Sequence, residues 1–223
     1  ERSFEMDKIE LIATATFGLE AIVAREVRKL GFDEVKVENA RVTFKASPAD
    51  ICRANLWLRS ADRVLVKMGE FPARSFTELF DQTRELPWSD WLPANANFPV
   101  QGKSIRSKLF SVPDCQAIVK KAVVESLKGR YHQEWFEESG PRYTIEVALL
   151  KDIATLTLDS SGAGLHKRGY RQLSSAAPLK ETLAAAMIDL SRWHPDRLMF
   201  DPFCGSGTIP IEAAMIALNQ APG

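Results

Sequence analysis

The stretch DPFCGSGTIPIEAA, residues 201–214, has the composition of a ligand-binding turn. Asp201 follows the apolar run LMF, glycines stand at positions 205 and 207, and an apolar helical pattern begins at once. Because glycine lacks a Cβ atom, the backbone can turn sharply there and a ligand can lie against it. The helix start adds unpaired N–H groups and the positive end of the helix dipole. We therefore expect a cofactor site at the carboxyl end of a strand in a Rossmann-like sheet.

Two phosphate-binding interpretations of this turn fail on the residues present. A P-loop needs a lysine directly after its last glycine, and Thr208 occupies that position. A dinucleotide-binding turn needs a third glycine three residues after Gly207, and position 210 is proline. A zwitterionic ligand with an adenosine moiety fits better, and a purely structural turn is the alternative.

The elements that must position this turn fall into three groups. Strand and helix patterns over 9–16, 18–31, 34–46 (a hairpin), 47–58 and 62–71 have the βαββαβ order of a ferredoxin-like sheet. Ser47 is the expected N-cap of the second helix. A second unit has helices at 75–86 and 112–129 and strands at 96–105, 143–150 and 152–159. Helices at 178–193 and 207–218 flank a short strand at 197–201.

The charges are balanced overall but locally clustered. The chain has 29 basic and 29 acidic residues, yet residues 101–130 hold seven basic and two acidic ones, and residues 160–180 hold four basic and no acidic ones. Such patches suit a polyanion bound at one site, although a solvated helix face and loop would have the same composition. The three cysteines form no CxxC pair, so we expect neither a metal site nor a disulfide framework. No membrane span or secretion signal is visible, and a cytoplasmic setting is expected.

Four segments resemble one known family, in that family's order. Residues 201–214 resemble motif I of class I S-adenosylmethionine-dependent methyltransferases, and residues 162–188 are similar to the segment that precedes it. Residues 107–123 resemble the THUMP signature, and residues 12–31 resemble the family's opening. The family is the THUMP-containing RNA methyltransferases of the 23S rRNA guanine-N2 type, often labelled N6-adenine-specific DNA methylases. The resemblance implies an α/β (α+β) fold with a ferredoxin-like subdomain at 1–71, a THUMP RNA-binding domain at 72–160, and the linker and start of a Rossmann-like methyltransferase domain at 161–223.

The resemblance also implies a cofactor, S-adenosyl-L-methionine, and residues that bind it. Gly205 and Gly207 would line its methionine part, and the N–H groups of Ser206 and Thr208 would point at its carboxylate. The full expected set is Asp201, Pro202, Phe203, Gly205, Ser206, Gly207, Thr208, Lys180, Glu181 and Thr182. Cys204 is expected to be a small packing residue rather than a nucleophile.

The implied partner is RNA, with 23S rRNA as the expected substrate and rRNA processing as the expected role. The expected phosphate contacts are Lys103, Arg106, Lys108, Lys120, Lys121, Lys167, Arg168 and Arg171. His166 to Arg171 could also cover the cofactor. Phe110 is expected in the core, with a base-stacking role as the alternative. The oligomeric state stays open.

One part of the family's machinery is missing. Transfer to an exocyclic amine uses an (N/D)PP(Y/F) loop, which this sequence lacks, so no catalytic residue is assigned. We expect a portion of a longer protein that by itself binds the cofactor weakly or not at all and is inactive. The alternatives are an N6-adenine DNA methylase, a non-catalytic THUMP RNA-binding module, and a 4-thiouridine synthetase, whose SGGxDS loop is absent.

Overall fold

The structure is a computed structural model that describes residues 8–170 and 178–223. The chain forms two compact units. Unit 1 combines the residues up to Leu65 with Ser160–Gly223, and unit 2 is Val66–Asp159. The two chain ends therefore contribute to the same unit, although they lie far apart in sequence.

The first part of unit 1 has the predicted ferredoxin-like order. The elements are β1 (Ile9–Thr14), α1 (Glu20–Lys29), β2 (Asp33–Glu38), β3 (Arg41–Ala46), α2 (Asp50–Trp57) and the start of β4 (Arg63–Pro72). Their strands lie in the order β2-β3-β1-β4, and β3 pairs antiparallel with both β1 and β2. Leu11 and Phe44 face each other across β1 and β3 and are fully buried. The βαββαβ prediction is confirmed.

The start of α2 differs from the prediction. The helix begins at Asp50, and Ser47 does not cap it with its side chain. Instead, the N–H and Oγ of Ser47 donate to Asp50 Oδ2 at 3.0 and 2.7 Å. The carboxylate of Asp50, in the first turn of the helix, accepts both hydrogen bonds from Ser47, which lies in the preceding loop.

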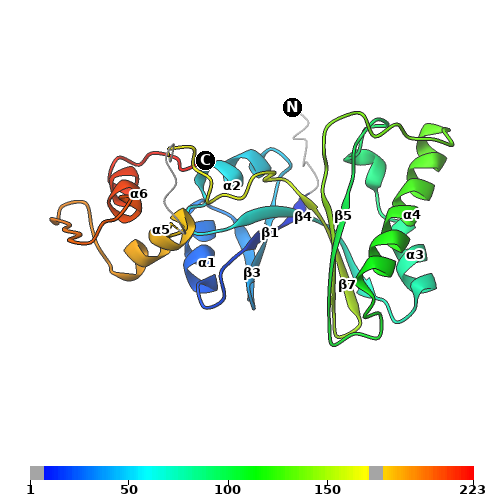
Figure 1. The fold of residues 1–223 in the computed structure, drawn as a ribbon, viewed down its shortest axis with the longest axis horizontal. Coiled ribbons are helices and arrows are strands. Elements are labelled where there is room, and N and C mark those ends of the chain that lie inside the picture. The colour runs from blue at the N-terminus through cyan, green and yellow to red at the C-terminus, as the bar shows by residue number, and fades with distance from the viewer. Residues whose placement is uncertain (1–7, 171–177) are drawn as a thin grey trace, which may run out of the picture. The chain divides into compact units, whose positions relative to one another are not determined.

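Unit 2 is a second α/β layer. It contains the end of β4, α3 (Phe76–Arg84), the short 3₁₀ turn η1 (Trp88–Asp90), β5 (Val100–Ile105), α4 (Val112–Tyr131), β6 (Ile145–Leu150) and β7 (Ile153–Asp159). Its strands lie in the order β4-β7-β6-β5, with β5 and β6 parallel. Helices α3 and α4 lie side by side against one face of these strands (Figure 1). Helix α4 continues through Gly129 and ends at Tyr131, and the C-cap residue His132 adopts the left-handed conformation.

The last part of unit 1 is two packed helices, α5 (Glu181–Leu190) and α6 (Thr208–Ala217). The strand predicted at 197–201 is absent: these residues form an irregular loop between the helices (Figure 1). Leu198 and Phe200 are 96% and 83% exposed. An extended segment becomes a strand only when another strand accepts its hydrogen bonds, and the described residues offer none to this segment.

The described residues were searched for membrane-spanning helices and for metal-binding clusters. Within them, no helix combines the length and the apolar character needed to cross a membrane. Across 8–170 and 178–223, no cluster of three or more histidine, cysteine or acidic side chains is placed to hold a metal ion.

Candidate functional site: a glycine turn on an anchored helix

The glycine turn before α6 has the backbone conformation that its sequence predicts. Gly205 and Gly207 have φ angles of +54° and +78°, in the left-handed region that favours glycine. Gly207 is the residue before the helix, and its N–H donates to Cys204 O at 2.8 Å. Upstream, the N–H of Phe203 donates to Asp201 Oδ1 at 3.1 Å. Hydrogen bonds within residues 201–207 therefore stabilise the turn, and α6 begins directly after it.

The outer face of this turn is open. Phe203 is 93% exposed, and Cys204 and Ser206 are also exposed. A Cβ atom added at Gly205 would meet nothing within 4 Å. The residues present fit the amino-acid part of S-adenosylmethionine to this extent: its carboxylate can approach bare backbone at a helix N-terminus. Pro210 has no N–H, so the first turn of α6 offers one donor fewer.

Cys204 does not pack into a core in this structure. Its side chain is exposed, so the expectation of a packing residue is wrong for the described residues. The physical reason is the same openness, because no described element covers the turn.

The three residues expected at the start of α5 occupy different environments. Lys180 is exposed at the N-cap, whereas Glu181 and Thr182 are buried at 5% and 2% exposure. Thr182 Oγ1 donates to Asp62 Oδ1 at 3.0 Å. Thr182 thus attaches α5 to the loop before β4, and its hydroxyl is directed at a protein carboxylate.

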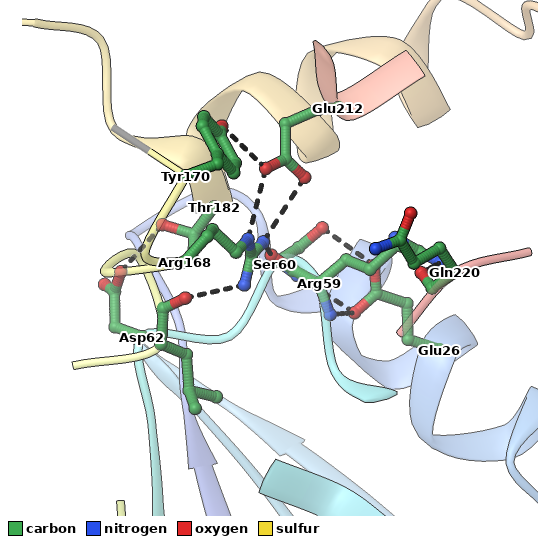
Figure 2. A network of polar contacts seen from close by, with 10 residues as sticks. Glu26, Arg59, Ser60, Asp62, Arg168, Tyr170, Thr182, Glu212 and Gln220 are labelled. Carbon is green, nitrogen blue, oxygen red and sulfur yellow. Dashed lines mark hydrogen bonds and ion pairs between the residues drawn. The ribbon is translucent and has the colours of Figure 1, made fainter. Parts of the chain in front are cut away.

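A buried polar network lies one turn beyond the start of α6 (Figure 2). Glu212 is fully buried, and its Oε1 accepts from Arg168 Nε at 3.1 Å and from Tyr170 OH at 3.0 Å. The guanidinium of Arg168 also donates to the backbone oxygens of Leu165 and Arg59, both at 2.6 Å. Burial and the carboxylate of Glu212 raise the pKa of Tyr170, so its phenol stays protonated as a donor.

This network changes the role of Arg168. Its side chain is 1% exposed and is held by Glu212, so it is not available to an RNA phosphate in this structure. Glu212 was not among the residues predicted from the sequence. A signal was present, because Glu212 is the one acidic residue in the apolar helix TIPIEAAMIA, and a buried charge needs a partner.

The other predicted RNA contacts divide into partnered and unpartnered cations. Lys103 Nζ lies 2.5 Å from Glu146, and Lys120 Nζ lies 2.6 Å from Glu138 and over the ring of Phe98. Those exposed without an ion pair among the described residues are Arg106, Lys108, Lys121 and Lys167. Arg171 lies outside the described residues.

Phe110 is 82% exposed, so its predicted core position is wrong. Leu109, its neighbour, takes the buried position at 6% exposure, which directs Phe110 outward beside the basic segment.

Comparison with family models defines the class of protein. Residues 10–65 match the RlmL ferredoxin-like domain, residues 73–159 match the THUMP domain, and residues 168–223 match the RMKL-like methyltransferase domain. With these three domains in this order, the chain belongs to the THUMP-containing methyltransferases. The domain boundaries at 71 and 160 stay a prediction.

Individual relatives make the likeness specific. The chain is 58% identical over 221 residues to the Bacillus subtilis protein named "Putative RNA methyltransferase YpsC", covering 98% of this chain and 57% of that protein. A Listeria monocytogenes structure, described as a predicted N6-adenine-specific DNA methylase, is 57% identical with a TM-score of 0.94, over 98% of this chain and 57% of the other. The structure described as "SMU.472, a putative methyltransferase complexed with SAH" is 50% identical with a TM-score of 0.91, over 97% and 57%. The chain thus spans little more than half the length of each.

Proposed function

We propose that this chain is the RNA-binding and cofactor-seating portion of an S-adenosylmethionine-dependent RNA methyltransferase. The observation that carries the proposal is the left-handed turn at Gly205 and Gly207, whose open backbone leads into the N-terminus of α6. A relative 50% identical to this chain was crystallised with SAH, which supports the same cofactor here.

RNA is the favoured substrate over DNA. The THUMP match covers residues 73–159, and the exposed cations Arg106, Lys108 and Lys121 lie within it. Double-stranded RNA is recognised through shape and phosphates, which suits a helix flanked by lysines. The name of the Bacillus subtilis relative points to RNA, while the description of the Listeria monocytogenes structure points to DNA adenine. An N6-adenine DNA methylase is therefore the second candidate.

The target we propose is guanine N2 of 23S rRNA, modified in the cytoplasm during rRNA processing. S-adenosylmethionine would supply an electrophilic methyl group. The residues of this chain would hold this methyl donor. The turn at 205 and 207 would accommodate its amino-acid part, and the N-terminus of α6 would attract its carboxylate. Arg106, Lys108, Lys121 and Lys167 would hold RNA phosphates.

The 223-residue chain alone is proposed to be inactive, because its sequence contains no (N/D)PP(Y/F) loop to accept hydrogen bonds from the target amine. Transfer of a labelled methyl group to 23S rRNA, tRNA and DNA should be compared for the intact protein and the isolated chain. We expect the intact protein, but not the isolated chain, to transfer label to 23S rRNA. Mass spectrometry should place the label on guanine N2. Label in DNA adenine, or transfer by the isolated chain, would contradict this assignment.

A further inference from the structure

Unit 1 contains a cavity of about 730 Å³, and the methyl-transfer proposal uses none of the residues that line it. Its walls are α1, α2, the C-terminal half of α5, the residues that follow α5, and the end of α6. The volume lies in the range of small-molecule binding sites. None of residues 201–208 lines this cavity, so it is distinct from the glycine turn.

The walls of the cavity carry an excess of positive charge. Arg25, Lys29, Arg53, Arg59 and Arg192 line it, against two carboxylates, Glu26 and Asp189. Both carboxylates are already engaged. Glu26 accepts from the N–H groups of Arg59 and Ser60 and from the Ser60 hydroxyl, and Asp189 pairs with Arg25.

Arg53 pairs with Asp50 at 3.6 Å, so Lys29, Arg59 and Arg192 remain to act on a ligand. Lys29 and Arg192 are exposed and make no ion pair within the described part of the chain. Arg59 Nη2 donates to Gln220 O at 2.6 Å, and both residues are labelled in Figure 2. Its other terminal nitrogen, Nη1, is buried and has no hydrogen-bond partner in the described residues. A buried guanidinium donor without an acceptor is unfavourable. Arg59 lines the cavity, so an anion bound there would give its guanidinium a charge-assisted partner.

Two tryptophans complete the wall. Trp57, the last residue of α2, and Trp193, which follows α5, both line the cavity. The indole N–H of Trp193 donates to Arg197 O at 2.9 Å, which fixes the ring. Tryptophan faces beside a cationic cluster are the combination that binds a base next to its phosphate.

We propose that this cavity binds a nucleotide, with Arg59, Lys29 and Arg192 on its phosphate and Trp57 or Trp193 on its base. The nucleotide could be free or part of an RNA strand, since both offer the same phosphate and base. The assignment does not depend on methyl transfer, because none of its residues belongs to the glycine turn.

Calorimetric titration of the intact protein with AMP, with ATP and with a single-stranded RNA decamer tests the site. The double variant Lys29→Gln/Arg192→Gln changes two exposed side chains and leaves the core intact. It should weaken binding of the recognised ligand by at least about tenfold, because two charge-assisted contacts are lost. Arg28→Gln is the matched control: Arg28 is exposed on the same helix but lies outside the cavity wall.

The three titrations distinguish a free nucleotide from an RNA strand. Binding of AMP or ATP that the double variant weakens supports a free nucleotide, and variant-sensitive binding of the decamer alone supports a strand. Arg59→Gln should add a further loss where circular dichroism shows that it folds. The assignment is overturned if the wild-type protein binds none of the three ligands, or if the double variant and Arg28→Gln bind equally well. Methyl-donor binding, measured in parallel, should be unchanged in the double variant.

Discussion

Two contrasting regions meet at the start of helix α6. The turn before it, with Gly205 and Gly207, is open and makes few contacts beyond its own backbone. Glu212, on the next turn of the helix, is fully buried and held by Arg168 and Tyr170. The ferredoxin-like part supplies a further contact, because the Arg59 carbonyl holds Arg168. The contrast shows how a turn that we propose to bind the cofactor can stay open and still have a fixed position, because its helix is held by Glu212 one turn away.

The largest expected effect is on the anchored region. Glu212→Ala should lower the free energy of unfolding by about 3 to 5 kcal/mol, because it leaves the buried guanidinium of Arg168 without its carboxylate. Chemical denaturation of the variant measures this. The control is Glu38→Ala, which removes a 2.8 Å ion pair to Arg41 from a carboxylate that is 48% exposed; its loss should stay under about 1 kcal/mol. Equal losses in the two variants would mean that the network does not anchor α6.

A double replacement sharpens the same point. Glu212→Leu combined with Arg168→Met removes both charges and keeps apolar volume, so it should recover most of the stability lost in Glu212→Ala. If the double variant is as unstable as the single one, the hydrogen bonds of Arg168 to backbone oxygens are the main contribution.

The open region should respond in binding more than in stability. Gly207→Ala places a side chain at φ +78°, which costs about 1 to 2 kcal/mol of stability. It should also weaken S-adenosylmethionine binding to the intact protein by at least about tenfold, since the turn backbone shifts against the ligand. Gly18→Ala is the control, because Gly18 has φ +89°, meets nothing within 4 Å and lies far from the turn in sequence. Unchanged donor affinity in Gly207→Ala would exclude the turn as the cofactor seat.

The cations of unit 2 also divide into those with an ion pair and those without one among the described residues. Replacing them should change RNA affinity by less than the changes above. Replacing Arg106 and Lys121 by glutamine should weaken RNA binding several-fold and lower the slope of log affinity against log salt by about 0.7 to 0.9 per lost contact. Lys128→Gln should do neither, because Lys128 already pairs with Glu125 and Glu134. Affinity measured at several salt concentrations decides this, and a salt-independent affinity of the wild-type protein would remove the phosphate contacts altogether.

The smallest effect concerns Glu26 and its pH dependence. Burial raises the pKa of Glu26 above 4.5, so the folded state favours the protonated acid. Its contribution to stability is therefore present below pH 4.5 and is lost as the pH rises through the raised value. Denaturation curves across this range should show that the stability of Glu26→Gln increases relative to that of the wild-type protein as the pH rises.

Glu20→Gln should show the opposite trend. Backbone N–H groups, that of Ala40 first, lower the pKa of Glu20, so its contribution is present above pH 4.5 and is lost as the pH falls. Parallel trends in the two variants would show that the surroundings of Glu26 do not favour its protonated form.

Local patterns predicted the fold well, and pairings distant in sequence limited the prediction of the site. The βαββαβ order follows from periodicity and turn residues, and the glycine turn follows from Gly205 and Gly207 alone. The contact of Arg168 with Glu212 joins residues 44 positions apart, which no local pattern specifies. The strand expected at 197–201 failed for a related reason, since a strand depends on its neighbours as much as on its own residues.

The most direct test of the account is a crystal structure of the intact protein with S-adenosylhomocysteine. We predict that the amino-acid part of the ligand lies against the backbone of Gly205 and Gly207, with Glu212 still paired to Arg168. A ligand bound elsewhere, with this turn unoccupied, would contradict the account.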